Sequence, residues 1–478
     1  MKDSYREYKN LNLTQIAKEI RKYWEDNDVF QKSLDNRKDG PAYVFYEGPP
    51  SANGTPGIHH VMARTIKDIF CRYQTLKGKR VSRKAGWDTH GLPVELGVEK
   101  KLGITKEDIG VKISVDEYNK ACREEVMKYK DLWDELTRTM GYWVNLDDPY
   151  ITFKNEYIET LWYLLSVIYK KGLLYKGYTI QPYSPAAGTG LSSHELNIPG
   201  CYRDVKDLTC TALFRVKAEQ STVKNNPFGV DVPFNSIQIA AWTTTPWTLP
   251  SNTALCVGNS IDYNLVKSVN PVSGEIAYFV IATPLMGSFF PKEDEKPSFE
   301  EYKVGDKKLP YEVLGTCKGK DLVGLEYEQL IPWVNPGEGA FRVIHGDYVS
   351  TEDGTGIVHI APTFGADDDR VAKQSGIPPL QMIDKDGKAQ PMVDRTGKFF
   401  KIEDLDEEFV KNFMNVEAYR PYAGQYVKNA FDATKTEKDK SLDVDIVVLL
   451  KEEGKLFKSE KHTHNYPHCW RTDKPVLY

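Results

Sequence analysis

The chain has 478 residues, of which 40% are hydrophobic and 27% are charged, and its formal net charge is −5. This length predicts roughly two to four domains, since domains usually have about 100–200 residues. The acidic balance excludes a globally basic nucleic-acid binder, so nucleic-acid contacts must come from local basic patches. Seven cysteines without a Cys-x-x-Cys pair indicate a reducing compartment rather than a disulfide framework. Without an apolar N-terminal signal or a bilayer-spanning run, a cytoplasmic protein without membrane contact is expected.

The first part of the chain predicts the opening of a doubly wound parallel sheet. Residues 13–24 carry apolar side chains at helical spacing, and residues 43–47 form a short buried strand that ends at Gly48-Pro49-Pro50. A helix follows over residues 60–76, and residues 80–83 begin the next strand. The apolar face of that helix is formed by Ile66, Ile69, Phe70, Tyr73 and Leu76. A strand, a Gly-rich turn, a helix and a second strand are typical of α/β nucleotide-binding folds.

Two long helices are predicted next, over residues 118–142 and 156–171, followed by a strand around residues 178–181. The apolar face of the second helix is formed by Tyr157, Leu161, Leu164, Leu165 and Ile168. From about residue 201 onward, short β-rich runs alternate with Gly, Pro and Asn turns, which predicts an inserted, mainly β, barrel-like domain. These runs are 213–216, 237–242, 277–282, 341–344 and 356–360, and a helix over 441–454 ends the region.

The predicted fold is therefore α/β. It is the first half of a Rossmann-like doubly wound nucleotide-binding domain, interrupted by an inserted mainly β, barrel-like domain. The predicted parts are an N-terminal helical arm at 1–42, the first half of the catalytic domain at 43–202, the insertion at 203–458, and a segment at 459–478 that returns toward the first domain.

The most informative stretch runs from Trp242 to Asn252 and reads Trp-Thr-Thr-Thr-Pro-Trp-Thr-Leu-Pro-Ser-Asn. Two prolines make it a poor helix and an interrupted strand. Threonine hydroxyls donate and accept hydrogen bonds while the methyls stay apolar, which suits a pocket for ribose hydroxyls and a small side chain. The alternative is a Thr-rich edge strand. The four threonines are Thr243, Thr244, Thr245 and Thr248.

Residues 49–60 form a Gly-rich segment between the first strand and the next helix, where doubly wound folds bind phosphates. Asn53 and Gly54 allow the backbone to turn closely. His59 and His60 can donate hydrogen bonds to a charged transition state, as adenylation requires. The alternative is an ordinary turn with two surface histidines.

Residues 86–95 end the second strand and read Gly-Trp-Asp-Thr-His-Gly-Leu-Pro-Val-Glu. Asp88 can hold a cationic ammonium group, and Trp87 and His90 can wall a small pocket beside it. The alternative is a turn that Asp88 caps.

Together these three segments resemble class I aminoacyl-tRNA synthetases, and within them the isoleucine-specific branch. The resemblance covers essentially the whole chain. The positions it implies for the amino acid are Gly48, Pro49 and Asp88, and those for ATP are Asn53, Gly54, Gly57 and His60. The family's His-x-Gly-His signature reads Gly57-Ile58-His59-His60 here, which is similar to the variant of a eukaryote-like branch. We therefore expect catalytic roles for His60 first and His59 second.

This family carries an editing domain inserted in its catalytic sheet, which matches the β-rich region. Its second signature falls on residues 354–369 and implies a discriminating His359 and an essential Asp368. Asp368 can bind the ammonium of a mischarged amino acid and help to orient a water molecule, and His359 can narrow the pocket to admit valine but not isoleucine. The alternative is an acidic run in a solvated loop. The implied editing pocket consists of Trp242, Thr243, Thr244, Thr245, Thr248, His359 and Asp368.

The resemblance implies a monomeric, ATP-dependent ligase that uses ATP with Mg²⁺, isoleucine and isoleucine tRNA. Structural zinc is not expected, because residues 182–187 contain no cysteine and residues 469–472 contain only one. His462, His464 and His468 add density near that cysteine without a recognisable ligand spacing.

The chain contains no Lys-Met-Ser-Lys-Ser loop, which completes the family's ATP site. We therefore expect an N-terminal part that retains hydrolytic editing of valyl-tRNA and forms isoleucyl-adenylate inefficiently. Two alternatives are a stand-alone aminoacyl-tRNA deacylase module and a paralogue that only binds tRNA.

Overall fold

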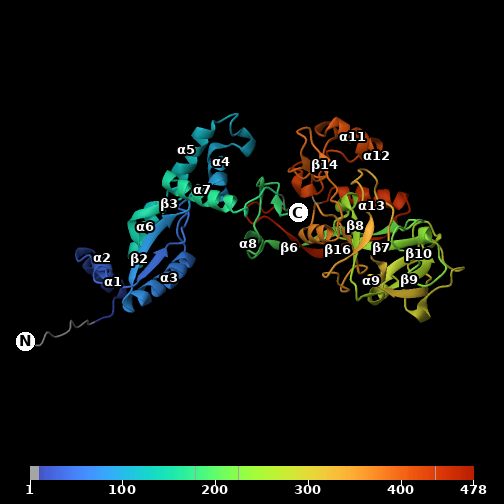
Figure 1. The fold of residues 1–478 in the computed structure, drawn as a ribbon, viewed down its shortest axis with the longest axis horizontal. Helices are drawn as coiled ribbons and strands as arrows, with labels where there is room; N and C mark the ends of the chain where they lie inside the picture. Colours follow the sequence, from blue (N-terminus) through green and yellow to red (C-terminus); the bar gives the residue numbers. More distant parts are fainter. Residues whose placement is uncertain (1–9, 178, 224, 437, 478) are drawn as a thin grey trace, which may run out of the picture. The chain divides into compact units, whose positions relative to one another are not determined.

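The computed structural model describes residues 10–177, 179–223, 225–436 and 438–477. They form two compact units, divided between Gly177 and Tyr178 (Figure 1). The first unit is α/β with a parallel sheet, and the second is built on a larger, mainly antiparallel sheet. The predicted α/β class, with a β-rich part after the parallel sheet, is confirmed. None of the helices in the described ranges combines the length and apolar character needed to cross a bilayer.

The first unit contains three parallel strands and the helices that connect them. The order is β1-β2-β3, with Ala42 opposite Arg80 and Lys84 opposite Asn145. The strands are β1 (Ala42–Tyr46), β2 (Arg80–Trp87) and β3 (Asn145–Ile151). The helices are α1 (Leu13–Asp26), α2 (Val29–Asp35), α3 (Ile58–Leu76), α4 (Leu92–Leu102), α5 (Val115–Val126), α6 (Lys130–Thr139) and α7 (Asn155–Lys170). Because the strands are parallel, β1 and β2 both deliver their carboxyl ends to the edge that carries the predicted nucleotide-binding turns.

Two predictions for this unit were wrong, and a third concerns the start of the second unit. The helix predicted over 118–142 is two helices, α5 and α6, because the Tyr129 N–H bonds to the Ala52 carbonyl at 3.0 Å instead of continuing the helix. The first strand was expected to be buried, yet Val44 is 64% exposed on the edge strand β1. The strand around 178–181 falls partly on Tyr178, outside the described residues, and the described residues 179–181 are not a strand.

Two predicted apolar helix faces exist but are not covered by other described residues of the first unit. The side chains of the α3 face, Ile66, Ile69, Phe70, Tyr73 and Leu76, are 55–81% exposed. The face of α7 is likewise exposed. Helical periodicity therefore identified the faces correctly but not their burial.

The second unit is built on a nine-stranded mixed sheet. Seven strands follow the order β11-β9-β10-β7-β13-β8-β12, and β6 pairs with both β7 and β16. The strands are β6 (Tyr202–Arg215), β7 (Ile237–Thr243), β8 (Ala254–Val257), β9 (Asp262–Val269), β10 (Ile276–Ala282), β11 (Glu312–Lys318), β12 (Arg342–His345), β13 (Ile357–Ile360) and β16 (Leu456–Pro467). The core contains fully buried aromatic side chains, among them Tyr263, Tyr327, Tyr419, Phe214, Phe279 and Phe399.

Shorter elements surround this sheet. They are the strand pairs β4 (Tyr183–Ser184) with β5 (Thr189–Gly190) and β14 (Met382–Ile383) with β15 (Ala389–Gln390), and the helices α8 (Ser193–Leu196), α9 (Gly319–Leu322), α10 (Ala366–Gln374), α11 (Glu407–Phe413), α12 (Val416–Tyr419) and α13 (Leu442–Glu452). β16 pairs with β6 along its length, ending with Pro467 opposite Tyr202. The predicted boundary at 458/459 therefore falls inside one strand, and Leu477 bridges to Tyr183 within the same unit.

Candidate functional site

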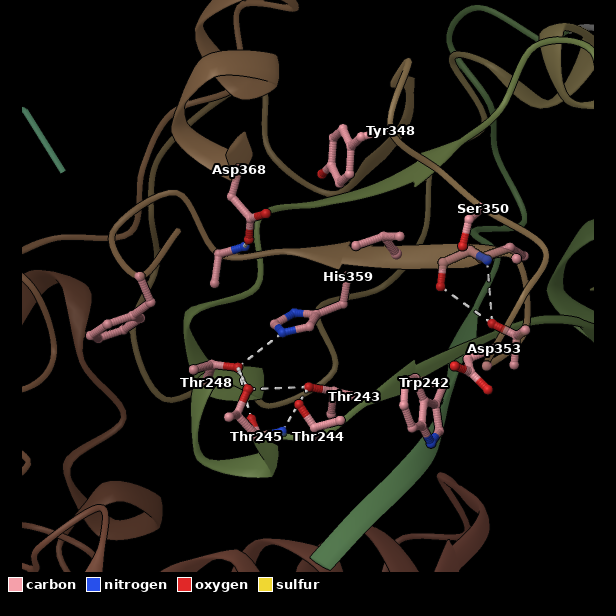
Figure 2. A pocket seen from close by; sticks show the side chains of 17 residues that line it. Trp242, Thr243, Thr244, Thr245, Thr248, Tyr348, Ser350, Asp353, His359 and Asp368 are labelled. Atoms are coloured by element: carbon pink, nitrogen blue, oxygen red, sulfur yellow. Dashed lines mark hydrogen bonds between the residues drawn. The ribbon is translucent and has the colours of Figure 1, made fainter. Parts of the chain in front are cut away.

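A cavity of about 350 Å³ in the second unit brings together the Thr-rich segment and the acidic segment (Figure 2). All the residues predicted for the editing pocket line it: Trp242, Thr243, Thr244, Thr245, Thr248, His359 and Asp368. Figure 2 shows His359 between the threonines and Asp368. The cavity therefore has hydroxyls on one side, an imidazole in the middle and a carboxylate on the other side.

The threonine wall forms where a strand changes into a short helix. β7 ends at Thr243, and the 3₁₀ helix η3 (Pro246–Ser251) begins with a proline, whose fixed φ suits a first helical turn. The Thr245 N–H donates to the Thr243 hydroxyl at 3.1 Å. The Thr245 hydroxyl lies 3.4 Å from the hydroxyls of both Thr243 and Thr248. The strand is thus interrupted as the two prolines predicted, and the turn that follows it places the threonine hydroxyls next to one another.

His359 on β13 is buried and fixed through both ring nitrogens. The Asn252 amide nitrogen, which can only donate, lies 3.4 Å from Nδ1, so Nδ1 accepts and Nε2 carries the proton. The Nε2–H then donates to the Thr248 hydroxyl at 2.9 Å, and that hydroxyl donates to the Thr245 carbonyl at 2.8 Å. The Asn252 amide is oriented by the Tyr327 hydroxyl, which donates to its oxygen at 2.7 Å.

Burial lowers the pKa of His359 to about 4, so the imidazole is neutral near pH 7. A neutral ring in a directed chain of hydrogen bonds is a rigid wall, not a proton donor to substrate. This arrangement suits the steric role predicted for it.

Asp368 is the one carboxylate of its acidic run that lines the cavity. It lies in the first turn of α10, and its Oδ2 accepts the Ala361 N–H at 2.9 Å. Asp367 is bound to Arg370 at 3.2 Å and Asp369 to Lys373 at 2.6 Å. The three acids therefore do not form a uniformly solvated run, which was the alternative interpretation.

Burial raises the pKa of Asp368 to about 6; the Ala361 N–H acts in the opposite direction. The group is thus mostly ionised at pH 7, and its negative charge is poorly solvated. A cation that entered the cavity would replace this missing solvation, and the site favours an ammonium group for that reason.

Several lining residues were not predicted from the sequence: Tyr348, Ser350, Asp353, Ala361 and Phe364. The Tyr348 hydroxyl is buried and acts on Asp368, whose pKa it lowers against the larger effect of burial. Glycines 354 and 356 also line the cavity with φ values of 74° and 72°, which favour glycine. Their Gly-x-Gly spacing was a visible signal for a tight turn, whereas no pattern marked Tyr348.

A second cavity, of about 360 Å³, lies in the first unit at the carboxyl end of β1 and the start of α3. The predicted residues that line it are Gly48, Asn53, Gly54 and His60. The Gly57 N–H donates to Nδ1 of His60 at 2.9 Å, which leaves the opposite nitrogen as the proton carrier. Burial, and then the charges of His59 and Arg64, lower the pKa of His60.

Pro49, Gly57, His59 and Asp88 do not line this second cavity. The Asp88 carboxylate accepts the His90 N–H at 3.3 Å, as in the capped-turn alternative, and the His59 and His60 ring centroids are 3.8 Å apart. Sequence reasoning missed Glu47, which lines the cavity, is nearly fully buried and pairs with Lys67.

In the part of the chain that the structure describes, no three His, Cys, Asp or Glu side chains are grouped to hold a metal ion. The histidines near Cys469 have separate partners. His464 lies 3.3 Å from Asp207, His468 contacts the Tyr466 carbonyl, and the His462 ring meets Trp242 edge-on.

Residues 19–435 match the family described as tRNA synthetases class I (I, L, M and V). Over its full length the chain is 62% identical to "Isoleucine--tRNA ligase" of Bacteroides fragilis and, by an alignment of the same coverage, 60% identical to that of Porphyromonas gingivalis. It spans 41% of the length of each of these relatives. The solved structure titled "The crystal structure of GlLeuRS-CP1" aligns with 54% of this chain and all of its own, at 15% identity and a TM-score of 0.32. Since the family match extends over most of the chain, this protein belongs to the class I tRNA synthetases of the I, L, M and V group.

Proposed function

We propose that the chain is part of an isoleucine–tRNA ligase and that its second unit hydrolyses valyl-tRNA formed in error. The relatives named above support the first half of this proposal, with identities of 60% and more across the chain. One structural observation carries the second half: Asp368 lines the same cavity as the threonine wall and His359.

In the proposed hydrolysis, the ionised Asp368 binds the ammonium of the aminoacyl ester. The hydroxyls of Thr243, Thr244 and Thr245 meet the ribose of the terminal adenosine and the ester, where each can donate or accept. The Thr248 hydroxyl donates its proton to the Thr245 carbonyl and can therefore only accept from the substrate. A water molecule held near the Asp368 carboxylate attacks the ester carbonyl carbon and releases a proton, while the carbonyl oxygen takes up the electron pair. The carbonyl then re-forms as the bond to the ribose oxygen breaks, and that oxygen takes up the proton. Valine and free tRNA leave the cavity.

The fixed ring of His359 sets the size limit in this scheme. One missing methylene changes binding in an apolar pocket by only about 1–3 kcal/mol, a magnitude for which this enzyme family is itself the standard example. A synthetic site alone therefore charges valine too often. A second pocket that rejects the larger isoleucine by contact with His359 removes the error.

For the synthetic reaction, the cavity at the start of α3 is proposed to bind ATP with Mg²⁺, beside an isoleucine held near Gly48, Pro49 and Asp88. His60 supports this proposal because its Nδ1 accepts from the Gly57 N–H, which leaves the other nitrogen free to donate to a phosphate. The whole enzyme is proposed to act as a monomer in the cytoplasm on isoleucine tRNA and to need no structural zinc.

The test measures the deacylation of isoleucine tRNA that has been mischarged with valine. Asp368→Ala should lower the rate at least about 100-fold, because the ammonium and the water lose their common anchor. Asp367→Ala is the matched control: it is the preceding residue, exposed and paired with Arg370, and should stay within about threefold of the wild-type rate. Equal rates for Asp368→Ala and the wild-type chain would remove the assignment.

A further inference from the structure

Asp443 is a buried carboxylate that lies outside the cavity and takes no part in the chemistry above. It stands in the first turn of α13 and is 7% exposed. Its Oδ1 accepts the backbone N–H of Trp247 at 3.0 Å. Trp247 is the second residue of η3, so its N–H has no partner within that helix. One carboxylate from a distant element thus holds the start of the threonine-bearing turn.

The residue held by Asp443 touches the cavity in two ways. Its backbone leads directly into Thr248, whose hydroxyl accepts the His359 Nε2–H. Its indole ring meets the ring of Phe364 edge-on, with centroids 5.1 Å apart, and Phe364 lines the cavity. A displacement of the Trp247 backbone therefore moves a hydrogen-bonded wall and an apolar wall together.

The charges around Asp443 come from three other elements. The Lys428 ammonium lies 3.0 Å from the Asp207 carboxylate, and its charge also lowers the pKa of Asp443. His464 lies 3.3 Å from the same Asp207 oxygen. Cys210 on β6 and Tyr466 on β16 also face Asp443. Lys428 is thus shared by two buried carboxylates.

Keeping a carboxylate at this position is unfavourable for folding. Burial raises the pKa of Asp443 to about 7, although Lys428 and the Trp247 N–H oppose that effect. An apolar side chain at a buried helix position packs without this desolvation cost. Two specific gains remain, the attraction to the Lys428 ammonium and the bond to the Trp247 N–H, and the bond to Trp247 is the one that leads to the cavity.

We infer that Asp443 is a positioning residue of the hydrolytic cavity, which holds Trp247 and thereby places Thr248 and Phe364 against a bound aminoacyl ester. The inference rests on the proposed hydrolysis of valyl-tRNA. Asp443 thus has a role in the reaction although it does not line the cavity.

The first test compares Asp443→Ala with Asp443→Asn in the full chain. Asp443→Ala should lower kcat for valyl-tRNA deacylation about tenfold or more with KM within about twofold, because binding groups remain but their alignment is lost. Asp443→Asn keeps an acceptor oxygen and should recover kcat to within about threefold of wild type. Asp445→Ala is the control, since Asp445 lies on the same helix and pairs with Lys440. Wild-type kcat in Asp443→Ala, or failure of Asp443→Asn to recover it, overturns the inference.

The second test measures the hydrogen bond between the Trp247 N–H and Asp443 and does not depend on enzymatic activity. The chain has nine tryptophans, so ¹⁵N-tryptophan labelling gives few backbone amide signals, and Trp247→Phe assigns the one required. Its exchange with solvent should be strongly protected in wild type and in Asp443→Asn, and at least about tenfold faster in Asp443→Ala. Rapid exchange in the wild-type protein overturns the inference even where Asp443→Ala does not fold. Absence of wild-type deacylation refutes the proposed function instead, whereas the exchange pattern still decides the role of Asp443.

Discussion

Four side chains and one carbonyl form a directed hydrogen-bond chain behind the cavity. The Tyr327 hydroxyl orients Asn252, Asn252 donates to His359, His359 donates to Thr248, and Thr248 donates to the Thr245 carbonyl. The Asn252 amide nitrogen also donates to the Ala254 carbonyl at 2.8 Å, and because this nitrogen can only donate, the chain fixes the tautomer of the imidazole as well as its position. In the proposed editing reaction, this fixed and uncharged ring is what limits the size of the bound amino acid.

Removal of the imidazole should relax the size limit. His359→Ala is expected to hydrolyse isoleucyl-tRNA at a rate within about tenfold of its valyl-tRNA rate, because the wall that excludes the extra methylene is gone. Deacylation of both esters by wild type and variant measures this. Asn252→Ala leaves the ring present and should keep most of the discrimination. A variant that still rejects isoleucine would show that another residue sets the limit.

The buried charge of Asp368 should make the protein less stable as pH rises. The difference between its pKa of about 6 and the ordinary value of 3.8 corresponds to about 3 kcal/mol. The folded state holds this proton up to about pH 6 and the unfolded state only to about pH 4. The contribution of the protonated Asp368 to the free energy of unfolding is therefore complete below pH 4 and is lost as pH rises to 6.

Asp368→Asn keeps the acceptor for Ala361 and removes the charge. Its free energy of unfolding should equal that of wild type at pH 4 and exceed it by about 2–3 kcal/mol at pH 7. Urea denaturation at pH 4, 5.5 and 7 measures the difference. Asp367→Asn should show no such growth, because that carboxylate is exposed. A constant difference across the three pH values would contradict the burial argument.

At the scale of elements, the cavity depends on the turn that leads into β13. The Thr355 carbonyl accepts the Ala282 N–H at 3.0 Å, and the Gly356 carbonyl accepts the Tyr263 hydroxyl at 2.7 Å. A Cβ on Gly356 would lie 2.4 Å from the Ala282 Cβ, at a φ of 72°. Both backbone conformation and close packing therefore require glycine there.

Gly356→Ala should destabilise the second unit by about 1–2 kcal/mol from backbone strain, with a further loss from the clash with Ala282. Gly387→Ala separates the two effects, since its φ is 73° and a Cβ there would meet nothing within 4 Å. Thermal unfolding of both variants measures the difference. Equal losses would show that the clash relaxes without cost.

The sequence predicted which residues share the threonine-lined cavity better than it predicted the elements around them. The Thr segment and the acidic signature are local motifs, and the structure places His359 and Asp368 in one cavity although they belong to different elements. The break between α5 and α6 was invisible because it depends on a contact between Tyr129 and Ala52. Tyr348 was also invisible, since only the fold brings a lone aromatic residue to the cavity.

At the scale of the molecule, the two units differ in how much they bury. The core clusters of the first unit are small, with Trp133 and Tyr142 among their buried members, and apolar faces of α3 and α7 stay exposed. The second unit has an extended core that includes Trp333 and a smaller cluster beside it that includes Ile344 and Ile360. The free energy of unfolding rises with the apolar area that a unit buries, so the first unit should be the less stable of the two.

Calorimetry of the 478-residue chain should therefore show two transitions, the lower one from the first unit. Trp133→Ala should lower only the first transition and Trp333→Ala only the second, each by about 3–5 kcal/mol of unfolding free energy. Both tryptophans are equally buried, which makes the pair a matched comparison. A single transition shifted by both variants would show that the units unfold together.

The long pairing of β6 with β16 has a consequence for how this protein family can change. It sets Tyr202 beside Pro467, so a very long excursion of the chain begins and ends at neighbouring points. The entropy of closing a loop grows only with the logarithm of its length. Residues can therefore be inserted or deleted in the loops between β6 and β16 while Tyr202 and Pro467 stay paired. The β6–β16 pair therefore makes the segment between these strands tolerant of insertions and deletions.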